Sequence, residues 1–168
     1  VYLAMTHLEK EGDDRIKKEY LTPSISGEKI GCLCITEPFA GSDVSGIRTT
    51  AVKKDDSYII NGSKTFITNG VYSDYLVVAA KTQPELGNKG ISIFVIDREA
   101  QGVSATKLDK LGWRASDTGE IAFDNDPNNY CIYSDIVKGE DRFAHNSTEY
   151  IHLLAEVGKR VFADRAEY

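Results

Sequence analysis

Short segments rich in β-branched and aromatic residues, separated by turn-forming residues, dominate the middle of the chain. Gly, Asn, Asp and Ser lie between these segments, at the spacing of an antiparallel sandwich or barrel. Among them, Asn61 and Gly62 are expected to form a turn. The segments cover residues 30–36, 46–54, 58–61, 64–68, 75–82, 91–97, 103–107 and 119–123. The sequence therefore predicts a mainly β fold, an antiparallel β-barrel or sandwich of about eight short strands.

Helical patterns precede the β segments. Residues 2–10 carry apolar side chains at helical spacing, and Gly12 is expected to end that helix. A second short helix is predicted to begin at Asp13 and to end before Pro23. The fold is therefore expected to begin with short N-terminal helices.

A further amphipathic pattern at residues 150–162 predicts one C-terminal helix of about four turns. The stretch before it lacks periodicity and is expected to be a linker. We therefore expect three parts: residues 1–28 as the end of a helical domain, residues 29–125 as a β domain, and residues 126–168 as a linker with a helix.

Charge and cysteine usage narrow the classes of function. The chain has 20 Lys and Arg against 26 Asp and Glu, a net charge of -6, which disfavours binding to nucleic acid. No apolar run approaches the roughly 20 residues of a membrane helix. Cys32 and Cys34 stand two apart in an extended run, where a disulfide is difficult, so we expect reduced thiols and an intracellular protein.

The common catalytic and metal-binding motifs are not found in the sequence. There is no GxGxxG after a strand, no GxxxxGK[ST], no HExxH and no CxxC. His7, His145 and His152 are too scattered to suggest a metal cluster. We therefore predict no metal site and assign no catalytic residue from motifs.

The first distinctive segment is Ile-Thr-Glu-Pro-Phe-Ala-Gly-Ser-Asp at residues 35–43. A strand is predicted to end at Thr36, because Pro38 cannot continue it. The small residues at 40–42 allow backbone amides to approach a bound group closely. This pattern indicates a loop that binds the polar or anionic edge of a ligand.

The second distinctive segment is Ser-Lys-Thr-Phe-Ile-Thr-Asn-Gly at residues 63–70. On a regular strand Lys64, Phe66 and Thr68 would share one face, and the Asn-Gly pair would turn the chain. A flat heteroaromatic ligand could stack on Phe66 while the Thr68 hydroxyl bonds its edge. The spacing alone favours ordinary sheet residues over this interpretation.

Together these two segments resemble the middle domain of the acyl-CoA dehydrogenases. Lys-Gly-Ile-Ser-Ile-Phe-Val at 89–95 and Lys-Leu-Gly-Trp-Arg-Ala-Ser-Asp-Thr at 110–118 follow in the order and spacing of that family. The resemblance covers residues 1–125, with Phe66 where many members have Trp. It implies FAD-dependent α,β-dehydrogenation of acyl-CoA thioesters.

The resemblance implies that this chain supplies the wall of a flavin site. In that family Phe66 would stack on the isoalloxazine ring, Thr68 would bond near N5, and Ser42 would also contact the substrate. The residues implied to bind the cofactor are Leu33, Ile35, Thr36, Gly41, Ser42, Phe66, Ile67 and Thr68. The implied partners are an acyl-CoA and an electron-accepting flavoprotein, with a homo-oligomeric full-length protein in the mitochondrial matrix or the bacterial cytoplasm.

Two departures from the family pattern leave alternatives open. Residues 126–150 match the family poorly, and its catalytic carboxylate lies in a C-terminal domain, so no base is named and a fragment is expected. Glu37, Lys89 and Arg114 are assigned no acid-base role. The alternatives are a truncated or degenerate, non-catalytic flavin- or acyl-CoA-binding module, and a flavin monooxygenase on the same scaffold.

Overall fold

The computed structural model describes residues 2–54, 57–123 and 134–135. In the described part, helices come first and strands follow. The elements are α1 (Tyr2–Glu11), α2 (Asp14–Ile16), η1 (Lys17–Leu21), α3 (Thr22–Ser26), β1 (Gly31–Cys34), η2 (Val44–Gly46), β2 (Thr50–Lys54), β3 (Ser57–Thr68), β4 (Tyr75–Lys81), η3 (Pro84–Gly90), β5 (Ile91–Asp97), β6 (Val103–Lys107), β7 (Thr118–Phe123) and β8 (Ser134–Asp135). The mainly β prediction is confirmed, whereas the predicted C-terminal helix lies outside the described residues.

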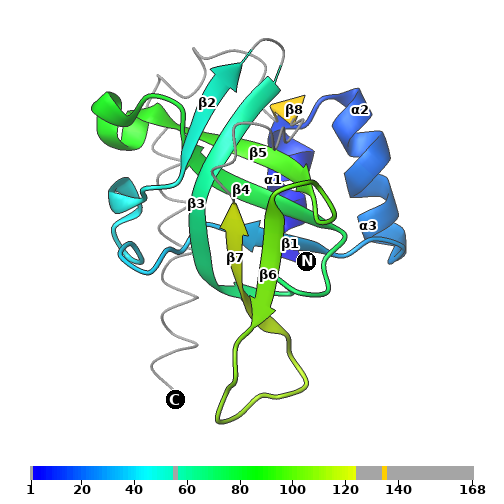
Figure 1. Cartoon of the computed structure of the whole chain (residues 1–168). Helices are drawn as coiled ribbons and strands as arrows, with labels where there is room; N and C mark the ends of the chain where they lie inside the picture. Colours follow the sequence, from blue (N-terminus) through cyan, green and yellow to red (C-terminus); the bar gives the residue numbers. More distant parts are fainter. Residues whose placement is uncertain (1, 55–56, 124–133, 136–168) are drawn as a thin grey trace.

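The strands form one curled sheet in the order β6-β7-β3-β2-β4-β5-β8, with β1 beside β4 (Figure 1). Most neighbouring strands are antiparallel. The pairings of β1 and β2 with β4 are parallel. The sheet is therefore mixed, and the expectation of a purely antiparallel sheet was wrong, because the chain between β1 and β4 crosses over instead of turning back directly.

The long strand β3 joins two segments that were predicted as separate strands with an Asn-Gly turn between them. Asn61 pairs with Thr50 of β2, and Gly62 pairs with Phe123 of β7, so the strand continues through this point while changing partner. A Cβ at Gly62 would lie 2.5 Å from Oγ1 of Thr49. The glycine therefore permits close approach of two backbones rather than a turn.

Two hydrophobic cores lie on opposite faces of β4 and β5. One core packs helical residues such as Leu8 and Ile16 against the sheet. The other packs the opposite face against β3 and β7 through Ile67 and Ile121. Because β4 is covered on both sides, nearly all of its residues are buried, as expected for a continuous apolar run in a central strand.

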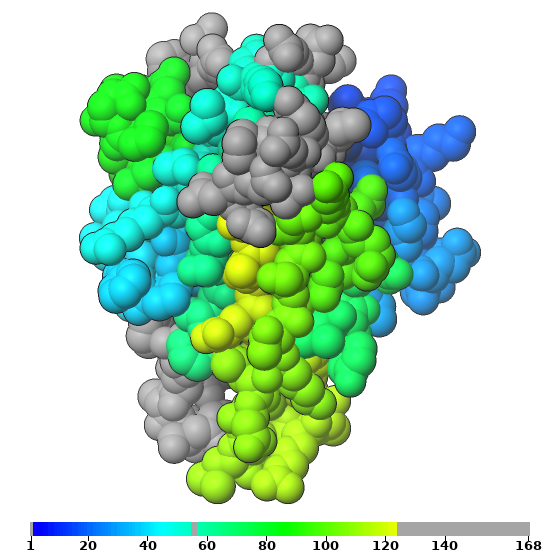
Figure 2. All heavy atoms as spheres, in the orientation of Figure 1, coloured from blue at the N-terminus to red at the C-terminus, as the bar shows by residue number. Residues whose placement is uncertain are grey.

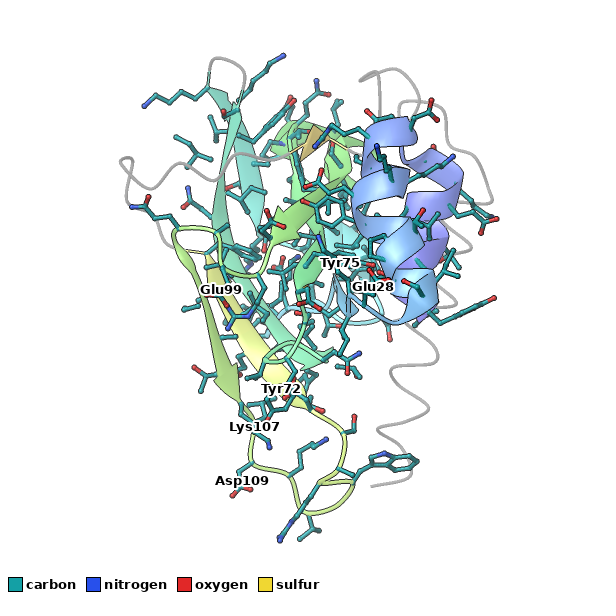
Figure 3. The ribbon with its side chains drawn as sticks, turned by 90° about the vertical axis from the view of Figure 1, so that its right-hand side faces the viewer. Glu28, Tyr72, Tyr75, Glu99, Lys107 and Asp109 are labelled. Carbon is teal, nitrogen blue, oxygen red and sulfur yellow. The ribbon has the colours of Figure 1, made fainter. Side chains whose placement is uncertain are left out.

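The helical entry continues beyond its predicted end. Pro23 lies in the first turn of α3, where the missing N–H is not needed, and the helix instead ends at Gly27 with φ of 82°. The hydroxyls of Ser24 and Tyr75 lie 2.8 Å apart and hydrogen-bond beneath this helix. Figure 3 shows Tyr75 between the sheet and the helical segment.

The loop between β6 and β7 projects from one end of the molecule (Figure 2). Lys110 holds it closed, because its Nζ donates to the Ser116 carbonyl at 2.7 Å and to the Thr118 hydroxyl at 2.9 Å. At its base, Nζ of Lys107 lies 5.9 Å from the centre of the Tyr72 ring, and Figure 3 shows the two side chains together. The loop thus has a defined conformation.

Candidate functional site

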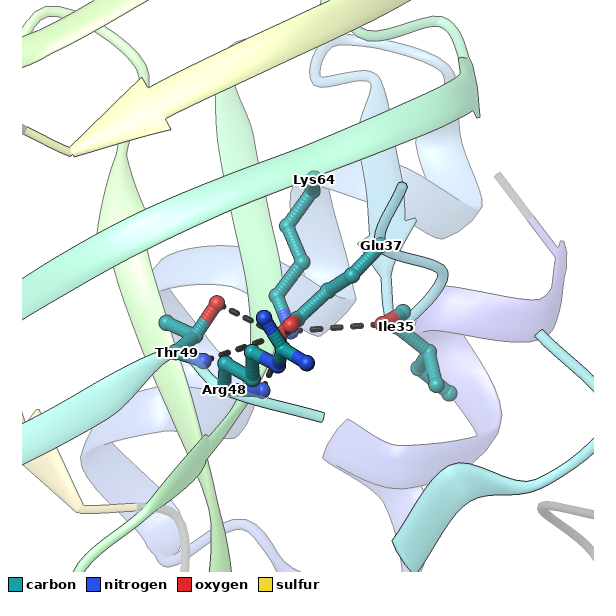
Figure 4. Close-up of polar contacts among 5 residues, drawn as sticks. All are labelled: Ile35, Glu37, Arg48, Thr49 and Lys64. Carbon is teal, nitrogen blue, oxygen red and sulfur yellow. Dashed lines mark hydrogen bonds and ion pairs between the residues drawn. The ribbon is translucent and has the colours of Figure 1, made fainter. Parts of the chain in front are cut away.

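A buried ion pair joins the two distinctive sequence segments. Nζ of Lys64, on β3, donates to Oε1 of Glu37 at 2.7 Å and to the Ile35 carbonyl at 3.2 Å (Figure 4). The side chains of Lys64 and Glu37 are 0% and 4% exposed. Both charges are thus removed from water, and hydrogen bonds surround them, as buried charges require.

The Glu37 carboxylate accepts further hydrogen bonds from the end of its own loop. Its Oε2 accepts from the Arg48 amide at 2.6 Å. Its Oε1 accepts from the amide of Thr49 at 3.0 Å and from the hydroxyl of Thr49 at 2.6 Å. Glu37 therefore closes a loop that runs from residue 37 to residue 49.

The charges of this pair affect each other's protonation. Burial raises the pKa of Glu37, but the Lys64 charge and the hydrogen bonds from Lys64, Thr49 and Arg48 outweigh burial and hold it below its usual value. Burial lowers the pKa of Lys64, and the Glu37 carboxylate opposes that shift. Glu37 is therefore a carboxylate at neutral pH.

The loop closed by Glu37 contains two tight turns. Glu37 and Ala40 exchange backbone hydrogen bonds of 2.9 and 3.2 Å. Further on, Oδ1 of Asp43 accepts from the Ser45 amide at 3.0 Å, which begins the short helix η2. Gly41 and Ser42 lie between these turns, Ser42 exposed and Gly41 half-buried, so a ligand can reach them.

A β-bulge interrupts β3 beside the ion pair. Lys64 pairs with Ile121 and Ile67 pairs with Gly119, so β3 has one more residue than β7 between these pairs. Lys64 and Ile67 are both buried, and Phe66, 46% exposed, has φ of 58°. The bulge therefore exposes Phe66 and Thr68 on the surface, whereas Lys64, predicted on their face, points into the protein.

Asp117 fixes the turn that follows Thr68. Its Oδ2 accepts from the amide of Val71 at 2.7 Å and from the amide of Tyr72 at 3.2 Å, and its carbonyl accepts from Asn69 at 3.2 Å. Asp117 is itself buried. Through it, the loop between β6 and β7 supports the end of β3.

The implied flavin-binding residues fall into two groups in the structure. The first group is accessible and consists of the exposed residues Ser42, Phe66 and Thr68 and the half-buried residues Leu33, Thr36 and Gly41. Ile35 and Ile67 are buried, in the helix-covered core and in the opposite core respectively. The Thr65 amide donates to the Thr36 carbonyl at 2.9 Å, which brings the two segments together.

Sequence reasoning missed the group that connects these segments. Glu37 was assigned no acid-base role, and Lys64 was placed on the same face as Phe66 and Thr68. The position of Lys64 within the second distinctive segment was the available signal, because its partner lies 27 residues away. Thr49 carried no signal, and Asp117 was noted only as part of residues 110–118, since the roles of both depend on tertiary contacts.

Comparison with known proteins identifies the class of this fold and site. Residues 32–125 match the acyl-CoA dehydrogenase middle domain. Over 124 residues the chain is 48% identical to the mitochondrial isovaleryl-CoA dehydrogenase of Arabidopsis thaliana, which covers 73% of this chain and 30% of that protein. The chain belongs to the acyl-CoA dehydrogenase family.

Two solved structures are similar over most of the chain. A glutaryl-coenzyme A dehydrogenase in complex with glutaryl-CoA has a TM-score of 0.76 and 35% identity, covering 93% of this chain and 41% of its own. A glutaryl-CoA dehydrogenase from Mycobacterium smegmatis in complex with FADH2 has a TM-score of 0.71 and 27% identity, covering 92% and 40%. The relatives in this family are FAD-dependent, and this chain spans less than half of their length.

Neither a metal cluster nor a membrane-spanning helix is found among the described residues. No three His, Cys, Asp or Glu side chains group there as metal ligands. No helix in the described ranges is both long and apolar enough to cross a membrane. Cys32 and Cys34 are buried free thiols whose sulfurs lie 3.5 Å apart.

Proposed function

We propose that this chain is the flavin wall of an FAD-dependent acyl-CoA dehydrogenase, which catalyses α,β-dehydrogenation of acyl-CoA thioesters. The observation that supports this most strongly is the bulge in β3. It exposes the Phe66 ring and the Thr68 hydroxyl on one surface, while Lys64 and Ile67 point inward. This surface combines an aromatic plane with a hydrogen-bonding group, as a flat heteroaromatic ring requires.

The residues present fit FAD, which when bound supplies the acceptor for the substrate's β-hydride. Phe66 would stack on the ring, the Thr68 hydroxyl would bond the ring edge, and Thr36 would bond a second polar edge. Ile35 and Ile67 are buried in opposite cores, so each would support the flavin-facing residues of its own segment from beneath. These residues orient the flavin and exclude water from one of its faces.

Residues of the loop that runs from residue 37 to residue 49 would contact the substrate. Ser42 is exposed between the turns at Glu37 and Asp43, and we propose that it contacts both the flavin and the pantetheine of an acyl-CoA. No residue of this chain is proposed as the catalytic base. An electron-accepting flavoprotein would reoxidise the reduced cofactor.

The proposed organisation follows the family. Residues 1–28 would end a helical domain, residues 29–125 would form the middle β domain, and residues 126–168 would form a linker and a helix. The relatives include a mitochondrial plant enzyme and a mycobacterial one, so the matrix or the bacterial cytoplasm is the proposed compartment. We further propose that the full-length protein is a homo-oligomer.

Flavin binding is tested by titrating the purified chain with FAD while recording the visible absorbance and the flavin fluorescence. We expect a shifted absorbance band and quenched fluorescence in the wild-type chain. Phe66→Ala should weaken both signals, whereas Val52→Ala, at an exposed position on β2, should not. No spectral change at high FAD would contradict flavin binding by this chain.

The alternative is a non-catalytic flavin- or acyl-CoA-binding module. Reduction of a dye by saturated acyl-CoAs of several lengths distinguishes it from a dehydrogenase. Turnover by the chain itself would contradict the non-catalytic alternative and would require a base that we have not identified. Flavin binding without turnover is expected of both, so only turnover decides between them.

A further inference from the structure

The ion pair between Glu37 and Lys64 lies at the junction of the two segments proposed to contact flavin. Lys64 donates to the Ile35 carbonyl and to the Glu37 carboxylate, so it holds the residues on both sides of Thr36. The residue after Lys64, Thr65, donates its amide to the Thr36 carbonyl at 2.9 Å. Two hydrogen bonds to backbone carbonyls and one to the Glu37 side chain thus fix β3 to residues 35–37.

The same carboxylate determines where the loop returns to the sheet. Glu37 accepts from the amides of Arg48 and Thr49, and from the Thr49 hydroxyl. Gly41 and Ser42 lie in the loop between these attachment points. A change at Glu37 would therefore move both ends of the segment that carries Ser42.

The bulge follows from the inward direction of Lys64. Lys64 and Ile67 are three residues apart and would point to opposite faces of a regular strand. Lys64 must point inward to meet Glu37, and Ile67 must point inward to fill its core. One extra residue satisfies both demands, and it places Phe66 at φ of 58° on the surface.

A buried ion pair adds little net stability, because desolvation of the charges offsets most of their attraction. Apolar residues of similar volume can replace such a pair without loss of stability. Such a replacement would, however, no longer hold neighbouring groups in position. Here those neighbours are Thr36, Thr65 and the bulge.

We propose that Glu37 and Lys64 are positioning residues, which hold Thr36, Ser42 and Phe66 in one arrangement that matches the flavin. Neither side chain needs to touch the cofactor, since both are buried behind these residues. This inference rests on the proposed function for its ligand. Its structural part, the fixing of β3 to Thr36, is independent of flavin.

The test uses the full chain with Glu37→Gln and Lys64→Met combined. This double variant removes both charges and retains one acceptor oxygen, which can accept from the Arg48 amide or from the Thr49 amide but not from both. The control is Arg15→Met combined with Glu19→Gln, which removes an exposed ion pair of 3.2 Å. For each protein we measure cooperative unfolding, the exchange rate of the Thr65 amide by NMR, FAD affinity and the bound-flavin spectrum.

We expect the Glu37/Lys64 double variant to fold, to exchange the Thr65 amide at least about tenfold faster and to bind FAD at least about tenfold more weakly, which is about 1.4 kcal/mol. Its bound-flavin band should also shift. The control variant should match the wild type in all measurements. A folded double variant with unchanged Thr65 exchange and unchanged FAD affinity would overturn the proposal.

Two smaller changes keep the test decisive if the double variant does not fold. Thr49→Val removes one hydrogen bond to Glu37, and Thr49→Ser retains it. We expect weaker FAD binding and faster Thr65 exchange for the valine variant, with rescue by the serine variant. Equal behaviour of valine, serine and wild type would contradict the proposal.

The exchange measurement separates this inference from the proposed function. If the wild-type chain does not bind FAD, the proposed function fails, and Thr65 exchange in the variants still decides whether the pair fixes β3. If the wild type binds FAD and the variants bind it equally well, the proposed function stands and the positioning role is wrong.

Discussion

The two halves of β3 belong to one strand but have different local structures. Residues 57–61 pair with β2 one to one, from Lys54↔Ser57 to Thr50↔Asn61. Residues 62–68 pair with β7 and contain the bulge, a buried charge and a bulky residue at positive φ. The first half is therefore a regular antiparallel ladder. The second half departs from regular pairing, and these departures expose the groups that we propose bind the ligand.

The bulge, the buried charge and the positive φ all occur where the two distinctive segments, residues 35–43 and 63–70, come together. The regular half is held by apolar packing, such as the contact of the Tyr58 and Phe94 rings with centroids 5.0 Å apart. The bulged half is held by the Glu37 and Lys64 ion pair and by Asp117. Changes in the first half should affect stability alone, whereas changes in the second should affect flavin binding more than stability.

The largest effect is expected from Ile60→Ala in the regular half. Ile60 is buried in the core that packs β3 and β7 against β4 and β5, and its truncation should lower the free energy of unfolding by about 2–5 kcal/mol. FAD affinity of the folded variant should not change. Urea unfolding and FAD titration measure the two quantities, with exposed Val52→Ala as control. A large loss of affinity in folded Ile60→Ala would contradict the separation of the two halves.

Gly62→Ala probes the boundary between the halves. The new Cβ would lie 2.5 Å from Oγ1 and 2.7 Å from Cα of Thr49, so the backbone must shift, at a cost of about 1–3 kcal/mol. Because Thr49 holds Glu37, FAD affinity should fall as well.

Gly87→Ala is the matched control for Gly62→Ala. Its φ of 61° and ψ of -123° are rarely adopted by alanine, but nothing lies within 4 Å of its Cβ position, so a conformational cost of about 1–3 kcal/mol is expected without a steric one. FAD affinity should be retained. Equal losses of affinity in the two variants would show that contact with Thr49 is not the cause.

The regular features of the chain were predictable from sequence, since they depend on local patterns. Alternation and turn residues located most strands, and residues 35–43 and 63–70 identified the family. The Asn61-Gly62 pair was misleading because Gly62 serves a close approach to Thr49 rather than a turn. The parallel pairing of β1 with β4 was not predictable, because it joins strands about 40 residues apart.

The positions of site residues were only partly predictable. Strand periodicity put Phe66 and Thr68 on one face, and both are exposed. The same periodicity put Lys64 beside them, which was wrong because the bulge shifts the register by one residue. A bulge depends on the partner strand, and a buried charge depends on a distant partner, so neither follows from local sequence.

Acid should weaken the bulged half specifically. The pKa of Glu37 is lowered in the folded chain, so its stabilising contribution is complete above the ordinary carboxyl pKa of about 4.3 and is lost as pH falls through the lower folded value. Each unit of depression corresponds to about 1.4 kcal/mol. The stability of the wild type relative to the neutral Glu37→Gln/Lys64→Met variant should therefore fall below about pH 4, whichever of the two is the more stable at pH 7.

Urea unfolding of the wild type and of this variant between pH 7 and pH 3 measures that difference. Carboxylates elsewhere titrate in both proteins, so their effects cancel when the two free energies are subtracted. Parallel curves over the whole range would mean that Glu37 does not titrate with a lowered pKa.

The smallest effect, a difference of about 1 kcal/mol in the free energy of unfolding, is expected between two variants of Phe66. The backbone has positive φ here, unlike in the regular half of β3. At φ of 58° an alanine is strained and a glycine is not, so Phe66→Gly should be more stable than Phe66→Ala. At Val52, in the regular ladder that faces the first half of β3, the order should reverse, because glycine costs about 0.5–1 kcal/mol relative to alanine in a strand.

Urea unfolding of these four variants, with FAD titration of the two at position 66, completes the comparison. Both Phe66 variants lack the ring and should lose FAD affinity equally, although their stabilities differ. Alanine being the more stable residue at both positions would show that the bulge is not strained at Phe66. If glycine is preferred at position 66 and alanine at position 52, the backbone of Phe66 is strained. The chain would then tolerate an unfavourable conformation at the residue whose ring is exposed for binding, as is found at other functional sites.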